Sequence, residues 1–174
     1  VIGAINGACA GIGFIQMASC DIVFASTAAK FTTAFARRGL PAENSLSWLL
    51  PRLVGTANAM DLLLSARVVP ADEAKEIGLV SKVFEPDDLL PATLAYARDL
   101  AANCSPASMA NIKQQVLADW ERGAEESRLR ALITVSEMGQ HSDFREGVMS
   151  FQEKRPPAFR GRDGRLHIPR SINR

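Results

Sequence analysis

Residues 3–21 read GAINGACAGIGFIQMASCD, and this stretch decides how the chain begins to fold. The apolar run from Val1 to Ile5 predicts a short strand. The glycines at 7, 11 and 13 predict a tight turn, and the apolar residues after them predict a helix near Gly13 to Ser19. Such a turn directs unpaired backbone N–H groups and the positive end of a helix dipole at a ligand. The ligand would be a phosphate or a carbonyl oxygen that gains negative charge.

The glycine spacing argues against nucleotide binding. The dinucleotide pattern G-x-G-x-x-G would need a glycine where Gln16 stands, and no acidic residue follows about twenty positions further on. A phosphate loop would need Gly-Lys-Ser/Thr after the turn, and this is missing. Two interpretations remain. The turn is either a packing turn with no ligand, or an oxyanion hole in which the N–H of Ile12 meets a carbonyl that becomes an enolate.

Composition narrows the class of protein. The 174 residues are 47% hydrophobic and 22% charged, which is typical of a globular protein large enough to bury a substantial core. The formal net charge of +1 creates no overall field that would favour nucleic acid or an anionic membrane. Basic residues gather only in the tail from Lys154 to Arg174, which we interpret as a solvated terminus or, alternatively, an anion-binding segment.

The cysteines and the start of the sequence bear on the expected cellular location of the protein. Cys9, Cys20 and Cys104 are too few and too scattered for a zinc site or a disulfide framework, so we expect a reduced, cytoplasmic protein without a metal. No apolar run has transmembrane length, and nothing resembles a signal peptide. The chain opens without Met inside a predicted strand, which suggests a fragment.

The order of predicted elements indicates an α/β region followed by a helical one. A second strand at Asp21 to Ala25 makes a strand–helix–strand unit and hence a parallel sheet. We expect the α/β region to cover residues 1–85 and the helical region, with its basic tail, residues 86–174. The further elements expected within residues 1–85 are a strand at Phe31 to Phe35, a loop at Arg37 to Ser45, a helix through Leu50, a helix face with Ala57, Met60 and Leu64, and a strand at Leu79 to Val83.

Two helix boundaries stand out in the second region. Ser105 and Pro106 combine an N-cap hydroxyl with proline at the first helical position. Ser142 or Asp143 is expected to open a last helix, which should run to about Lys154 before two prolines.

Four blocks of residues, in one order along the chain, resemble the crotonase superfamily, also called the enoyl-CoA hydratase/isomerase superfamily. The resemblance covers nearly the whole chain. The blocks are INGACAGIG (5–13) with Cys20-Asp21; GLPAE (39–43) with LPRLVG (50–55); ADEA (71–74) with GLV (78–80); and DFREGVMSFQEKR (143–155).

This resemblance implies a ββα spiral, of which the chain would hold the C-terminal part, followed by a helical trimerisation subdomain. Family members bind acyl-CoA thioesters and stabilise the thioester enolate between two backbone N–H groups. Ile12 would supply one N–H, and the other would lie in an N-terminal segment that this chain does not contain. The expected partners are an acyl-CoA substrate and further copies of the chain, as a homotrimer or a dimer of trimers. No cofactor is expected.

The chain departs from the family at the two glutamates of its hydratases, because Ile15 and Phe35 stand at the matching positions. Water addition needs a carboxylate pair, so the sequence argues against ordinary hydratase activity. Glu43 falls where several isomerases and a dehalogenase of the family carry an acidic residue. We expect it to move a proton between carbons of an enolate; the alternative is a solvated loop carboxylate.

The resemblance also suggests substrate contacts. Three hypotheses follow: an enolate-forming isomerase, a hydrolase or weak hydratase in which Glu43 activates water, and a non-catalytic acyl-CoA-binding protein. Phe151 and Lys154 match a family motif whose lysine often reaches CoA, although a lysine there is commonly a plain surface charge. The expected substrate-binding residues are Ala10, Gly11, Gly13, Ile15, Phe35, Phe151 and Lys154.

Overall fold

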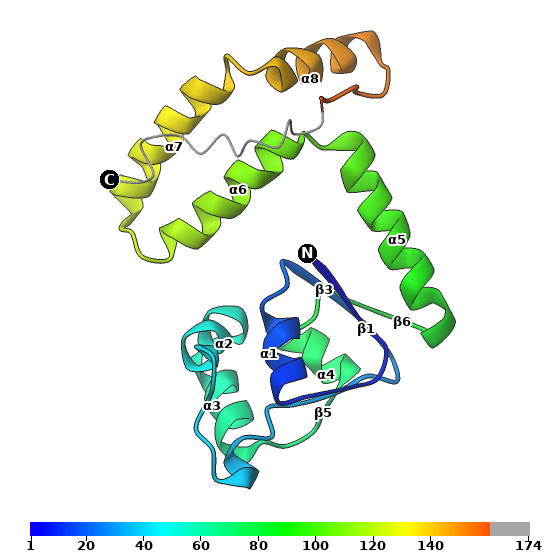
Figure 1. Cartoon of the computed structure of the whole chain (residues 1–174), viewed down its shortest axis with the longest axis vertical. Coiled ribbons are helices and arrows are strands. Elements are labelled where there is room, and N and C mark those ends of the chain that lie inside the picture. The colour runs from blue at the N-terminus through cyan, green and yellow to red at the C-terminus, as the bar shows by residue number, and fades with distance from the viewer. Residues whose placement is uncertain (161–174) are drawn as a thin grey trace. The chain divides into compact units, whose positions relative to one another are not determined.

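The computed structural model of the chain describes residues 1–160 and contains two compact units, one of residues 1–97 and one that begins at Arg98 (Figure 1). The first unit holds β1 (Ile2–Ile5), β2 (Ala8–Ala10), α1 (Ile12–Ala18), β3 (Ile22–Ser26), β4 (Lys30–Thr32), the 3₁₀ turn η1 (Ala36–Arg38), α2 (Leu46–Val54), α3 (Thr56–Ser65), β5 (Val69–Pro70), α4 (Ala71–Glu76) and β6 (Lys82–Phe84). Helix α5 (Pro86–Asn103) leads into the second unit, which holds α6 (Pro106–Asp119), α7 (Ala124–Met138) and α8 (Ser142–Glu153).

Two small sheets organise the first unit. In one, β3 pairs in parallel with both β1 and β6, which confirms the predicted strand–helix–strand unit. In the other, β4 pairs in parallel with β2 and antiparallel with β5. The prediction that the glycine turn runs directly into a helix is wrong, because β2 lies between Gly7 and the helix and leaves only Gly11 as the connection.

Two predicted strands have different bounds. The strand expected at Phe31 to Phe35 ends at Thr32, because the backbone of Ala34 turns left-handed (φ 64°). The strand expected from Leu79 begins only at Lys82, because the N–H of Leu79 donates back to the carbonyl of Ala74 at 2.8 Å and so continues the turn after α4.

Helix α3 contacts α2 (Figure 1), and the face that it buries differs from the apolar face expected from the sequence. Met60 and Leu64, on the suggested face, are 50% and 69% exposed, whereas Ala59 and Leu62 are 0% and 2% exposed. Apolar residues occur on both sides of this helix, so their periodicity cannot tell which side is buried.

The core of the first unit forms around α1. Phe14, Ile15, Met17 and Ala18 are all buried, although the helix has only seven residues. They belong to one apolar cluster that also includes Phe31 of β4 together with residues of α2, α3 and α4. Because tertiary packing supplies most of the stability of such a short helix, the position of α1 depends on this cluster.

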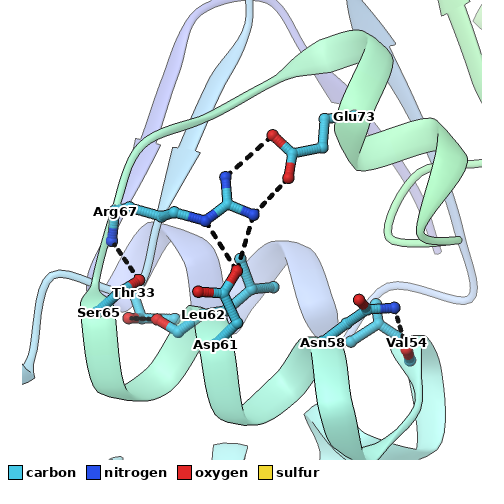
Figure 2. A network of polar contacts seen from close by, with 8 residues as sticks. All are labelled: Thr33, Val54, Asn58, Asp61, Leu62, Ser65, Arg67 and Glu73. Carbon is cyan, nitrogen blue, oxygen red and sulfur yellow. Dashed lines mark hydrogen bonds and ion pairs between the residues drawn. The ribbon is translucent and has the colours of Figure 1, made fainter.

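An ion-pair cluster holds the turn after α3 (Figure 2). The guanidinium of Arg67 donates to Asp61 at 2.8 Å and to both carboxylate oxygens of Glu73. These hydrogen bonds hold the pKa of Glu73 below its usual value. The N–H of Arg67 donates to the Ser65 hydroxyl at 3.1 Å, so the turn is fixed on both sides of its left-handed residue, Ala66 (φ 45°).

In the second unit, the predicted N-cap of α6 is confirmed, since the Ser105 hydroxyl accepts a hydrogen bond from the N–H of Ser108. The same hydroxyl donates to the buried carboxylate of Asp143, one residue into α8. The predicted bounds of the last helix are confirmed to within one residue. Within residues 1–160, no helix is long and apolar enough to cross a membrane. The part of the predicted basic tail beyond Arg160 lies outside the described residues.

Two leucines of α3 provide a matched test of this packing. Leu62→Ala should lower the free energy of unfolding by about 2–5 kcal/mol, because it opens a cavity in the core. Leu64→Ala should change it by less than about 0.5 kcal/mol, because that side chain is 69% exposed. Urea unfolding followed by circular dichroism would measure both variants. A larger loss for Leu64→Ala than for Leu62→Ala would contradict the assignment of the buried face.

Candidate functional site

The turn into α1 is built on Gly11. Its backbone has φ 51° and ψ −119°, a conformation that only glycine adopts readily. The N–H of Gly11 donates to the carbonyl of Thr32 at 3.3 Å, and its carbonyl accepts the first helical hydrogen bond, from Ile15 at 3.1 Å. The next peptide N–H, that of Ile12, belongs to the first residue of the helix.

This N–H has the properties that an oxyanion donor needs. Ile12 is the first residue of α1, so its N–H has no acceptor within the helix. Among residues 1–160, no side chain caps α1 either. The side chain of Ile12 is 58% exposed, so the start of the helix is open to an approaching group.

Gly13 leaves further open space beside this N–H. A Cβ added at Gly13 would meet no atom of the described residues within 4 Å. Gly13 also has no left-handed backbone that would require glycine. Because glycine in a helix is about 0.5–1 kcal/mol less favourable than alanine, packing within the described chain does not account for Gly13.

Ile15 and Phe35, which the resemblance matches to the two hydratase glutamates, lie in the same buried cluster. Their exposures are 8% and 6%, and both belong to the apolar cluster around α1. Ala42 packs against the same cluster. Both side chains are apolar, so neither could take up or release a proton.

Glu43 directly follows Ala42, which packs against this cluster, and is half-buried. Its carbonyl accepts a hydrogen bond from the N–H of Leu46 at 3.0 Å, which closes the turn into α2. No other residue in the described part of the chain forms a hydrogen bond or an ion pair with its carboxylate. Within the described chain, the carboxylate therefore has no side chain that competes with a ligand for it.

Left-handed residues flank both parts of the site. Ala34 (φ 64°) directly precedes Phe35, and Asn44 (φ 47°) and Ser45 (φ 60°) directly follow Glu43. For residues other than glycine this conformation costs about 1–2 kcal/mol, and such strain gathers at ligand and active sites. Sequence patterns gave no signal for these positions, because none of them is glycine.

The two expected CoA contacts lie in the second unit. Phe151 is 85% exposed near the end of α8, and Lys154 is the C-cap of that helix in a left-handed conformation (φ 53°). The next residue, Arg155, donates to both carboxylate oxygens of Glu146. Together with the N–H of Ala158, it lowers the pKa of Glu146 to about 2. The segment that carries Lys154 is therefore anchored against α8.

Sequence reasoning missed one feature of this second unit. A pocket of about 430 Å³ lies where α7 meets α8, lined among others by His141, Phe144 and Val148. Phe144 is 57% exposed beside it. The apolar pattern of α8 could have indicated the exposed side chains, but not the pocket.

The chain is similar to known proteins in sequence and in structure. The sequence model of the family described as enoyl-CoA hydratase/isomerase matches residues 1–162. A "probable enoyl-CoA hydratase" of Rhodobacter capsulatus is 40% identical over 167 residues, which cover 93% of this chain and 63% of the relative. A 1,2-epoxyphenylacetyl-CoA isomerase of Escherichia coli is 34% identical, over 93% of this chain and 62% of the relative.

A solved structure of a similar protein supports the same family. The crystal structure of a probable enoyl-CoA hydratase/isomerase from Mycobacterium abscessus has a TM-score of 0.90 and 32% identity, over 93% of this chain and 66% of that one. The chain thus spans about three fifths of the length of the two curated relatives named above. With the fold and a family match over almost the whole sequence, the chain belongs to the enoyl-CoA hydratase/isomerase family.

Proposed function

We propose that this chain is part of an acyl-CoA-processing enzyme that stabilises a thioester enolate and moves a proton between carbons, as an enoyl-CoA or dienoyl-CoA isomerase does. The observation that carries the proposal is the contrast between Ile15 and Phe35, buried in one apolar cluster, and Glu43, half-buried next to Ala42 and without a side-chain partner among residues 1–160. A single carboxylate suits proton transfer between carbons of a bound chain.

The N–H of Ile12 would receive the thioester oxygen. A donor aimed at developing negative charge typically contributes about 3–4 kcal/mol to a transition state. The exposed start of α1 and the open space at Gly13 support this role. Ala10 and Gly11 would line the same approach, since they lead directly into the helix.

Glu43 alone could both remove and return the proton in this reaction. Its carboxylate removes a proton from a carbon next to the double bond, and the electron pair of that C–H bond moves through the conjugated chain to the thioester oxygen. Protonated Glu43 then returns the proton to another carbon as the enolate collapses. The double bond has moved, nothing is oxidised or reduced, and Glu43 is restored without a cofactor.

A second candidate function is water addition or hydrolysis with Glu43 activating water. This candidate is favoured by the similar proteins, because most of those considered are named as hydratases, among them the relative from Rhodobacter capsulatus. The isomerase of Escherichia coli supports the first candidate at similar identity. A third candidate is a non-catalytic acyl-CoA-binding protein.

The helical unit is proposed to carry self-association as a trimer or a dimer of trimers, and Phe151 and Lys154 to contact CoA. Several large apolar side chains of α6 and α7 are exposed in this chain, which supports an interface there. They are Ile112, Val116, Leu117, Leu129, Leu132, Ile133 and Val135. We further propose a cytoplasmic location and a role in acyl-CoA or fatty-acid metabolism.

Glu43→Gln in the complete protein tests the proposal. The change keeps the shape of the side chain but removes its ability to take up a proton, so turnover of enoyl-CoA or dienoyl-CoA thioesters should fall by about 10²–10⁴-fold. Acyl-CoA binding, measured by calorimetry, should change little. A panel of enoyl-, dienoyl- and hydroxyacyl-CoA thioesters, followed by chromatography of the products, would separate isomerisation from hydration and hydrolysis.

The matched control is Glu76→Gln, which changes an exposed carboxylate at the end of α4 and should leave turnover unchanged. Unchanged turnover in Glu43→Gln would refute the role of Glu43. Tight binding without turnover in the unmodified protein would support the non-catalytic candidate instead.

Gly13→Ala tests whether the open space beside the Ile12 N–H is used. Alanine should raise the free energy of unfolding by about 0.5–1 kcal/mol, because the position is helical and uncrowded. It should lower turnover about tenfold, because the methyl group would occupy the space of the thioester. Gly123→Ala, at an equally open glycine before α7, is the control and should keep full turnover. A more stable Gly13→Ala protein with full activity would show that the substrate does not approach there.

A further inference from the structure

Thr32, the last residue of β4, makes contacts to both parts of the candidate site. In the β2–β4 pairing it lies opposite Ala10, and its carbonyl accepts the N–H of Gly11. Its hydroxyl accepts the N–H of Ala34 at 3.1 Å and donates to the carbonyl of Ala66 at 2.9 Å. One residue therefore joins the turn before the Ile12 N–H to the turn before Phe35.

Both backbone groups that the Thr32 hydroxyl contacts belong to left-handed residues, Ala34 (φ 64°) and Ala66 (φ 45°). Alanine adopts this conformation only where its surroundings compensate for the strain. At Ala34 the hydroxyl supplies part of this compensation. At Ala66 the ion pairs of Arg67 hold the following residue, so the acceptor of the Thr32 hydroxyl is itself rigidly placed (Figure 2).

Carbonyl groups at the C-terminal end of α3 accept further hydrogen bonds from the segment of residues 32–37. The last carbonyls of a helix lack partners within it and must find donors elsewhere. Here the Leu62 carbonyl accepts the buried hydroxyl of Thr33 at 2.8 Å, and the Ser65 carbonyl accepts Nε of Arg37 at 2.9 Å (Figure 2 draws the first of these). Three donors of the segment from residue 32 to residue 37 therefore meet carbonyls at one helix end.

We infer that Thr32 is a positioning residue, whose hydroxyl holds the segment that carries Phe35 and leads to Glu43 in register with the Ile12 N–H. The inference rests on the proposed function for its catalytic consequence. It assigns Thr32 no contact with substrate: the residue acts through the backbone of Ala34 and through the pairing of β2 with β4. Loss of the hydroxyl should therefore impair turnover more than substrate binding.

The test compares three substitutions in the complete protein. Thr32→Val keeps the shape and the strand preference of the side chain but removes the hydroxyl. The substrate is the acyl-CoA thioester that the unmodified protein turns over. Its kcat should fall about tenfold, and its KM should change by less than about threefold. Thr32→Ser keeps the hydroxyl and should restore kcat. Thr93→Val removes a buried hydroxyl that donates to the Leu89 carbonyl outside this segment, and should leave kcat unchanged.

Amide hydrogen exchange, measured by mass spectrometry, gives a readout that does not depend on turnover. Peptides from residues 33–43 should exchange faster in Thr32→Val than in the unmodified protein, and at the unmodified rate in Thr32→Ser and Thr93→Val. Unchanged exchange in Thr32→Val, an equal loss of kcat in Thr93→Val, or failure of Thr32→Ser to restore kcat would overturn the inference. Absence of turnover in the unmodified protein would refute the proposed function, and the exchange rates would still decide whether the hydroxyl holds the segment.

Discussion

The candidate site depends on the short parallel pairing of β2 with β4, where Ala10 lies opposite Thr32. This pairing and the hydrogen bond from the Gly11 N–H to the Thr32 carbonyl bring the start of α1 next to the segment that leads to Phe35. Three residue pairs are a small ladder, and such a ladder is not stable alone. It is held because Cys9 and Phe31, one from each strand, are buried in the cluster around α1.

The proposed chemistry depends on which groups of the candidate site are exposed and which are buried. Within residues 1–160, the start of α1 is exposed at Ile12 and capped by no side chain, and Gly13 adds no side chain beside it. Ile15, one turn further along, is buried and apolar. An N–H can polarise a thioester carbonyl, but an isoleucine cannot deliver water. In the mechanism that we propose, Glu43 therefore transfers the proton as the single carboxylate of the site.

Periodicity and glycine spacing were enough to predict β1, α1, β3 and the last helix, because each of these elements has a clear apolar run or a capping residue. They failed at the end of β4, where Ala34 turns left-handed and the hydroxyls of Thr32 and Thr33 donate to the carbonyls of Ala66 and Leu62. Apolar residues on both sides of α3 concealed its buried face. The choice of Glu43 as a site residue came from family resemblance, since no local pattern distinguishes it from a solvated loop carboxylate.

Deuterium exchange measures most directly whether the complete protein forms a thioester enolate. A saturated acyl-CoA would be incubated with the protein in deuterium oxide, and its mass and proton spectrum followed with time. Polarisation of the carbonyl and proton removal by one carboxylate predict that deuterium enters the carbon next to the thioester carbonyl, while the CoA thioester stays intact. Tight binding of the acyl-CoA without incorporation of deuterium would contradict the account.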